Sequence, residues 1–308
     1  MRIAFLGTPE FAIPSLQMLI DSGHELAVFT QPDRPVGRHK TPEPPPVKLL
    51  AQRYGIPVFQ FEKIRRPEGV DALKSFGPDL MVTAAFGQIL SAENLSIPKY
   101  GCINVHGSLL PKYRGAAPIQ WSVIDGETVT GITTMQTDVG MDTGDILMQE
   151  ETVIGPDETS GELYGRLALI GADLLKRTIA SLEAGTLVRT PQDESHATKC
   201  PMLKKEHGKI DFSKGALAVH NLVRGVNPWP GAYALLDGDT LKIWKTALTD
   251  KSSSGFEPGT LFGNEKEGLF LQCADRPLEI LELQAPGGKR LDAVTFLRGR
   301  KISGSILT

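Results

Sequence analysis

An asparagine and a histidine separated by one residue are the side chains in this sequence best suited to catalysis. Asn104 and His106 follow a short apolar segment, residues 101–103, whose composition predicts a β-strand. Side chains two positions apart on a strand project from the same face, so the amide and the imidazole would lie side by side. An amide can donate hydrogen bonds to an oxyanion, and an imidazole can transfer a proton. Acyl transfer needs both functions.

The residues around this pair resemble the folate-dependent formyltransferases. The pair continues as Asn104-Val105-His106-Gly107-Ser108-Leu109-Leu110-Pro111 and then as Arg114-Gly115-Ala116-Ala117-Pro118, and Asp142 follows in a glycine-rich loop at residues 138–145. The resemblance implies that Asn104, His106 and Asp142 are catalytic and that 10-formyltetrahydrofolate is the formyl donor. It also implies that two stretches line the donor pocket, namely Phe86, Gly87, Gln88, Ile89 and Leu90, and Ser108, Leu109, Leu110 and Pro111.

A second resemblance concerns residues 30–40, which are rich in proline, glycine and basic side chains. Composition alone predicts an exposed loop after a strand. The segment resembles the loop that enters the acceptor end of the tRNA in the methionyl-tRNA formyltransferases, with Arg38 at the position important for recognition. The resemblance implies tRNA contacts by Arg34, Arg38, His39 and Lys40, which could hold phosphates and reach base edges.

The family chemistry implied here is formyl transfer from 10-formyltetrahydrofolate to the α-amino group of methionine on initiator tRNA. Asn104 and a protonated His106 would stabilise the tetrahedral oxyanion, and His106 would pass a proton to the departing folate nitrogen. Asp142 would favour the imidazolium form of His106 and order a water molecule. The reaction requires no metal, and the histidines and cysteines show no metal-ligand spacing.

The elements that must position these groups alternate between strands and helices. Strands are predicted at residues 3–6, 25–30, 79–85, 101–105 and 131–136. The alternation predicts an α/β fold with a doubly wound, Rossmann-like parallel sheet. Ligands of such sheets bind beyond the carboxyl ends of the strands, where His106 stands. A capping box, Thr159-Ser160-Gly161-Glu162, begins a long helix that ends at Gly185.

Three parts are predicted along the chain. Residues 1–189 form the formyltransferase domain that binds folate and carries the chemistry, residues 190–208 form a linker without clear periodicity, and residues 209–308 form an OB-like tRNA-binding domain. Short alternating strands separated by Gly/Asp turns predict the small β-barrel of this last domain. From residue 209 onward there are 13 Lys and Arg against 11 Asp and Glu, whereas residues 1–190 have 17 against 22.

Bulk composition narrows the class of protein. A hydrophobic content of 41% and a charged content of 22% are typical of a soluble globular protein. The net charge of −3 does not by itself indicate a nucleic-acid-binding protein. The sequence begins directly with a predicted strand and has no apolar run long enough for a bilayer, so we expect a cytoplasmic protein without a signal or transit peptide. The resemblance implies a monomer.

Two other activities stay open. A formyltransferase acting on an amino sugar nucleotide would share the three catalytic residues but lack the basic loop. A 10-formyltetrahydrofolate hydrolase, alone or as a domain of a larger dehydrogenase, would share the folate site and release formate. A non-catalytic tRNA-binding module is disfavoured because all three catalytic-type residues are present.

Other familiar motifs are incomplete. The turn Gly7-Thr8-Pro9 lacks the glycines of a dinucleotide site, and Ser108 does not stand in a G-x-S-x-G elbow. The loop at residues 138–145 lacks the glycine and glutamate that a calcium loop requires.

Overall fold

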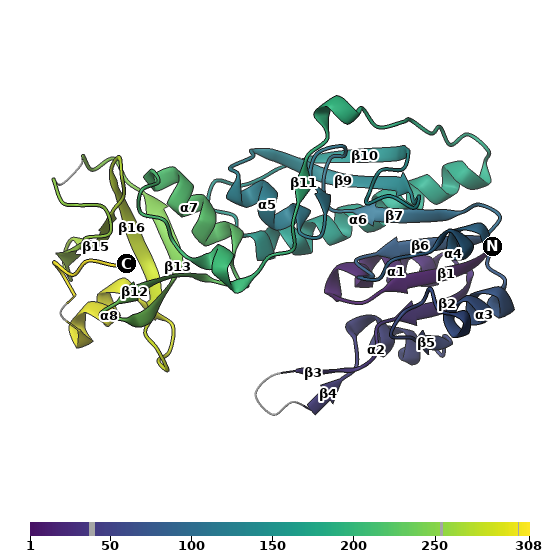
Figure 1. Cartoon of the computed structure of the whole chain (residues 1–308), viewed down its shortest axis with the longest axis horizontal. Helices are drawn as coiled ribbons and strands as arrows, with labels where there is room; N and C mark the ends of the chain where they lie inside the picture. Colours follow the sequence, from purple (N-terminus) through teal and green to yellow (C-terminus); the bar gives the residue numbers. More distant parts are fainter. Residues whose placement is uncertain (37–40, 253–254, 301) are drawn as a thin grey trace. The chain divides into compact units, whose positions relative to one another are not determined.

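The computed structural model describes residues 1–36, 41–252, 255–300 and 302–308. The chain forms two compact units whose segments alternate along the sequence (Figure 1). The first unit contains Met1–Gly115, Thr130–Thr152 and Tyr164–Cys200, and the second contains Ala116–Val129, Val153–Leu163 and Pro201–Thr308.

A seven-stranded sheet with the spatial order β10-β9-β7-β6-β1-β2-β5 forms the centre of the first unit (Figure 1). Its strands are β1 (Arg2–Gly7), β2 (Glu25–Thr30), β5 (Val58–Gln60), β6 (Leu80–Ala84), β7 (Cys102–His106), β9 (Val129–Gln136) and β10 (Ile146–Val153). The neighbouring strands from β5 to β7 all pair in parallel. β1 and β6 are almost entirely buried, as their predominantly apolar sequences require in a sheet that is covered on both faces.

The remaining elements of this unit connect and cover the strands. The helices are the 3-10 turns η1 (Glu10–Ala12) and η2 (Glu194–His196) and the α-helices α1 (Ile13–Asp21), α2 (Pro46–Arg53), α3 (Pro67–Phe76), α4 (Ala92–Ser96) and α6 (Ser160–Glu183). Two further short strands, β8 (Arg114–Gly115) and β11 (Lys199–Cys200), pair in parallel.

Helix α6 lies close to β7 because residue 171 is a glycine. A Cβ atom at Gly171 would lie 2.8 Å from Val105 Cγ1, which is closer than a methyl group can approach. Val105 therefore points toward α6. The pleat of the strand turns Asn104 and His106 to the opposite face, where they are free to form a site.

The predicted α/β fold is confirmed, with one difference in strand direction. β9 pairs with β7 in the antiparallel direction, so the sheet is mixed rather than wholly parallel. Antiparallel neighbours need no crossover helix, and an alternating sequence pattern does not distinguish the two directions. β10 was not predicted, because Ile146–Val153 mixes apolar residues with Gln and Glu and has no period-two pattern.

The segment predicted as an exposed loop, residues 30–40, supplies the first strand of a small hairpin. β3 (Arg34–Val36) and β4 (Thr41–Glu43) pair in the antiparallel direction, with Arg34 opposite Glu43. Two prolines, Pro35 and Pro42, face each other in this register. Prolines are confined to edge strands and bulges, so a segment that contains them is not readily predicted as a strand. The hairpin was therefore not predicted from the sequence.

The second unit is built on an antiparallel sheet with the order β12-β13-β16-β15-β14, and β17 pairs with β16. Its strands are β12 (Ala232–Leu236), β13 (Asp239–Leu248), β14 (Leu261–Asn264), β15 (Gly268–Gln272), β16 (Pro277–Gln284) and β17 (Leu291–Asp292). Its helices are α5 (Pro118–Ile124), η3 (Lys205–Gly208), α7 (Ala216–Gly225) and α8 (Ala293–Gly299). Apolar side chains of α7, α8 and the strands form one core, so the predicted small β domain is confirmed.

No helix within the described part of the chain is long and apolar enough to cross a membrane.

Candidate active site

Asn104 and His106 lie together at the carboxyl end of β7, as their spacing predicts. Thr83, the cross-strand partner of Asn104 on β6, donates its hydroxyl hydrogen bond to Asn104 Oδ1 over 2.9 Å. This bond uses the acceptor end of the amide. The two N–H donors of Asn104 Nδ2 therefore point away from Thr83 and toward the loop that carries Asp142.

Asp142 joins the pair from a distant part of the chain. Its Oδ1 lies 3.5 Å from Asn104 Nδ2 and 3.7 Å from His106 Nδ1. Its other carboxylate oxygen, Oδ2, accepts a hydrogen bond from the Gly115 N–H over 2.9 Å. The structure thus brings together all three residues that were predicted to be catalytic, with one carboxylate oxygen facing both partners.

The hydrogen bond made by Nε2 of His106 determines which of the two ring nitrogens can exchange a proton. His106 Nε2 lies 3.0 Å from the Tyr113 carbonyl oxygen, which can only accept. Nε2 therefore carries a hydrogen, and Nδ1 is the nitrogen left to gain or lose a proton. Since Nδ1 is also the atom that faces Asp142, proton transfer by His106 would take place on the Asp142 side. The imidazole is 5% exposed, so bulk water has little access to it.

The segment after His106 is held by a set of buried hydrogen bonds. Ser108 is completely buried, and its hydroxyl donates to the Lys112 carbonyl over 2.6 Å. The Leu110 N–H donates to Thr133 Oγ1, and Gln149 Nε2 donates to the Leu110 carbonyl. Leu110 is buried, whereas Leu109 and Pro111 are partly exposed. The Ser108 side chain therefore shapes the segment and does not face an open pocket.

The stretch at residues 86–90 divides its side chains between the interior and the surface. Phe86 and Leu90 pack into the hydrophobic core, and Gln88 is bonded to the backbone of residues 61 and 64. Gly87 is exposed, and Ile89 is 70% exposed. The carbonyl oxygen of Phe86 accepts hydrogen bonds from Thr8 and Gln31, so the turn is fixed in place.

The basic segment is only partly described. Arg38, His39 and Lys40 lie outside the described residues. Arg34 is exposed, and its guanidinium donates to Glu62 Oε2 over 2.6 Å. At the base of the hairpin, Lys48 Nζ donates to both oxygens of Asp33 over 2.9 Å and to Gln60 Oε1.

Both parts of the chain match known families. Residues 1–179 match the family described as formyl transferase, and residues 202–301 match the formyl transferase C-terminal domain. A methionyl-tRNA formyltransferase from Ruminiclostridium cellulolyticum is 50% identical over 98% of this chain and 97% of its own length. A second, from Geotalea uraniireducens, is 53% identical over 100% of this chain and 98% of its own length.

The chain belongs to the methionyl-tRNA formyltransferase family. The resemblance stated from the motifs is therefore confirmed over the whole chain. Among solved structures, the N-formyltransferase from Helicobacter canadensis in complex with folinic acid and dTDP-3-aminofucose has a TM-score of 0.69. It is 21% identical, over 94% of this chain and 99% of that chain, and at this identity the likeness shows the fold alone.

Several residues that support the site were not predicted from the sequence. Thr83, Tyr113 and Gln192 each hold a catalytic residue or its loop in place. The polar Thr83 inside the apolar run of β6 is a signal that could have been recognised. Gln192 stands in the segment predicted as a linker, where no local pattern distinguishes it from other polar residues.

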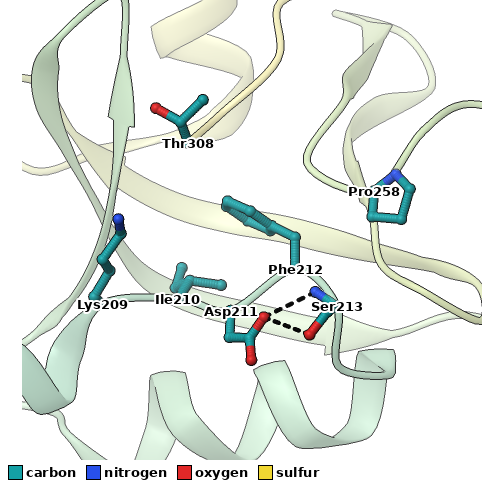
Figure 2. Close-up of a pocket in the computed structure, with 7 residues that line it drawn as sticks. All are labelled: Lys209, Ile210, Asp211, Phe212, Ser213, Pro258 and Thr308. Atoms are coloured by element: carbon teal, nitrogen blue, oxygen red, sulfur yellow. Dashed lines mark hydrogen bonds between the residues drawn. The ribbon is translucent and has the colours of Figure 1, made fainter.

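A cavity of about 560 Å³ lies elsewhere, in the second unit (Figure 2). It is lined by Lys209, Ile210, Asp211, Phe212, Ser213, Pro258 and Thr308. The Asp211 carboxylate accepts hydrogen bonds from the Ser213 N–H and hydroxyl, as Figure 2 shows, so this acidic group closes a turn. None of the predicted site residues lines this cavity.

Within the described part of the chain, no group of three or more His, Cys, Asp or Glu side chains is arranged to hold a metal ion.

Proposed function

We propose that the protein transfers the formyl group of 10-formyltetrahydrofolate to the α-amino group of methionine on initiator tRNA, producing formylmethionyl-tRNA for translation initiation. The observation that carries this proposal is the identity of about half of all residues, over essentially the whole chain, with methionyl-tRNA formyltransferases. The cluster of Asn104, His106 and Asp142 supplies groups that this chemistry needs. The protein is therefore a transferase.

The formyl donor would bind beside the catalytic cluster. A protein of the same fold was solved with folinic acid, a formyl-bearing folate. In this chain the carboxyl ends of β6 and β7 lead directly into the two predicted folate segments, residues 86–90 and 108–111. The exposed Gly87 and Ile89 would contact the ligand, while the buried members of both segments would shape its pocket.

The chemistry follows from the positions of the donors. The methionine nitrogen forms a bond to the formyl carbon, the bond from that carbon to the folate nitrogen breaks, and one proton passes from the first nitrogen to the second. Asn104 Nδ2 would donate to the oxyanion that forms during this exchange. A protonated His106 would also stabilise this oxyanion and would pass its Nδ1 proton to the folate nitrogen. Asp142 would take up the proton that the attacking nitrogen loses and return it to His106.

The hairpin of β3 and β4 would bind the acceptor end of the tRNA. Arg34, Arg38, His39 and Lys40 supply the positive charge that phosphate contacts require. The cluster of Lys48, Asp33 and Gln60 fixes the base of this hairpin to the first unit. Because Gln60 Nε2 also donates to the Gln31 carbonyl, and Gln31 Nε2 donates to Phe86 O, the base is bonded to the folate segment.

We propose that residues 1–189 bind folate and carry the chemistry. Residues 190–208 would connect this part to residues 209–308, which would contact the tRNA backbone as an OB-like domain. The second unit offers a combination of aromatic and basic groups suited to this role. Lys242 Nζ and Arg290 Cζ lie 5.1 and 5.0 Å from the centre of the Trp244 ring. Such groups can contact phosphates and stack against bases.

Initiator tRNA as substrate also implies a cytoplasmic protein, and we propose that the protein acts as a monomer.

A transfer assay with three acceptors tests the proposal. The chain is incubated with 10-formyltetrahydrofolate and either methionine-charged initiator tRNA, an amino sugar nucleotide or no acceptor. We expect rapid formylation of the tRNA and neither formyl sugar nor free formate. Formylation of the sugar instead would assign the protein to the sugar-modifying branch. Formate released without an acceptor would keep the folate site and replace transfer by hydrolysis.

A further inference from the structure

The last segment of the first unit returns to the active site. Residues 190–200, here called the return segment, follow α6 and end in β11, which pairs in parallel with β8. The return segment was predicted to be a linker, yet it supplies several hydrogen bonds to the backbone around His106 and Asp142. The most complete set is made by Gln192.

Gln192 uses all the hydrogen-bonding capacity of its amide. Its Nε2 donates to the carbonyl oxygens of Asp142 and Gly144 over 2.8 and 2.7 Å. Its Oε1 accepts from Arg114 Nε and Nη2 over 3.0 and 2.8 Å. Since a carbonyl only accepts and a guanidinium only donates, the orientation of this amide is fully determined by its neighbours.

Arg114 completes this network with a buried charge. The residue is 3% exposed, and its two terminal nitrogens donate to the two carboxylate oxygens of Glu194 over 3.0 and 2.7 Å. The hydrogen bond that Arg114 donates to Glu194 keeps the pKa of Arg114 above its ordinary value, so the guanidinium remains charged. Arg114 also precedes Gly115, whose N–H binds Asp142 Oδ2. Asp142 is thus held at its carbonyl oxygen by Gln192 and at its carboxylate by the backbone N–H of Gly115.

Asp142 needs such support because its backbone is strained. Its φ of +54° lies in the left-handed region, which is costly for residues other than glycine and persists when the surrounding contacts enforce it. The two carbonyl groups bonded by Gln192 belong to Asp142 itself and to Gly144. Losing these bonds would allow the backbone to relax and the carboxylate to move away from His106.

The return segment also fixes the partner of His106. Thr198 Oγ1 accepts from the Tyr113 N–H over 2.8 Å, and the Thr198 carbonyl accepts from the Arg114 N–H over 2.9 Å. Tyr113 is the residue whose carbonyl binds His106 Nε2. One segment therefore holds both the histidine and the aspartate at their relative positions.

We infer that Gln192 and Arg114 are positioning residues for formyl transfer, which hold the Asp142 carboxylate at its place beside Asn104 Nδ2 and His106 Nδ1. This inference rests on the proposed function for its activity test. Neither residue touches the reacting atoms in this arrangement. Their substitution should therefore affect kcat more than the binding of either substrate.

The test compares the wild-type chain with Q192L, R114K and the matched control Q17L. Gln17 is also a bonded glutamine of the first unit, but its partners are Asp21 and Tyr54. We expect Q192L to lower kcat by roughly 10- to 100-fold, since small displacements at a reacting centre have effects of this size. KM for methionyl-tRNA and for the folate should stay within about twofold. R114K should give a smaller loss, and Q17L should match the wild type.

Two results of this comparison would overturn the inference. One is a Q192L enzyme with wild-type kcat. The other is a loss of kcat that simply follows the loss of folded protein, measured by circular dichroism on the same samples.

A measurement without substrates separates this inference from the proposed function. The ¹⁵N resonance of His106 Nδ1 should move in Q192L and remain unchanged in Q17L at the same pH. An unchanged His106 resonance in Q192L would contradict the positioning role whatever the enzyme formylates. A wild-type chain that fails to formylate methionyl-tRNA would instead contradict the proposed function, and the resonance would still decide the role of Gln192.

Discussion

The catalytic cluster and the basic hairpin belong to the same unit but are held in different ways. Asn104, His106 and Asp142 are bonded to partners from β6, from residues near β8 and, through Gln192, from the return segment. In the described part of the hairpin, the base is bonded through Asp33 and Lys48, which are partly exposed. At the start of β3, the exposed Arg34 has the exposed Glu62 as its partner.

This difference corresponds to two different physical tasks. A group that reacts must be placed within a fraction of an ångström, so its backbone and its second hydrogen-bonding atom are both fixed. A group that attracts a phosphate acts over longer distances and tolerates several positions. Substitutions in the cluster should therefore reduce kcat, and substitutions at the hairpin base should reduce tRNA binding.

The largest effect is expected for Asn104→Ala. Removing a donor to the oxyanion should lower kcat by roughly 100- to 1000-fold with little change in thermal stability. Steady-state formylation and circular dichroism measure the two quantities. An Asn104→Ala enzyme with near-normal turnover would show that the amide is not the oxyanion donor.

A smaller effect with a different signature is expected for Lys48→Met. The substitution removes the cation that bonds to Asp33 and Gln60, so the base of the hairpin should lose its fixed position. We expect KM for the tRNA to rise about tenfold, while KM for the folate and kcat stay close to wild type. A change confined to kcat would contradict the division between the two regions.

The ionisation of Asp33 gives a direct probe of the hairpin base. Hydrogen bonds from Gln60 and then Lys48 hold the pKa of Asp33 below its ordinary value of 3.8. Because the folded-state pKa is lowered, these bonds stabilise the fold above pH 3.8, and their contribution is lost as the pH falls through the folded-state value. In Gln60→Leu the carboxyl group should titrate closer to 3.8, as measured by ¹³C NMR. An unchanged midpoint would mean that Gln60 does not stabilise the carboxylate.

A small effect on stability is expected for Arg34→Ala. Both members of the Arg34–Glu62 pair are more than half exposed, so the free energy of unfolding should change by less than about 1 kcal/mol. Urea denaturation measures this change. A much larger loss would show that the Arg34 side chain packs against the unit beyond its ion pair.

The sequence predicted some features of these two regions and not others. The strand with Asn104 and His106 and the α/β fold were predicted because apolar runs and a period of two are local signals. Asp142 was predicted from the resemblance to the formyltransferases. The antiparallel direction of β9, the strand β10 and the hairpin were not predicted. Each depends on which segments pair, and pairing is decided by contacts between residues far apart in the chain.

The order of residues by itself determined the chemical groups of the candidate site: an amide and an imidazole on one face of a strand, and a carboxylate in a glycine-rich loop. Only the tertiary structure decided that Asp142 faces the Nδ1 atom of His106, that Tyr113 occupies the Nε2 atom, and that Gln192 holds the loop. The physical reason is that these contacts join side chains and backbone groups of separate segments, with Gln192 and Asp142 lying 50 positions apart in the chain. Their geometry depends on the whole packed unit, and no local periodicity or motif encodes it.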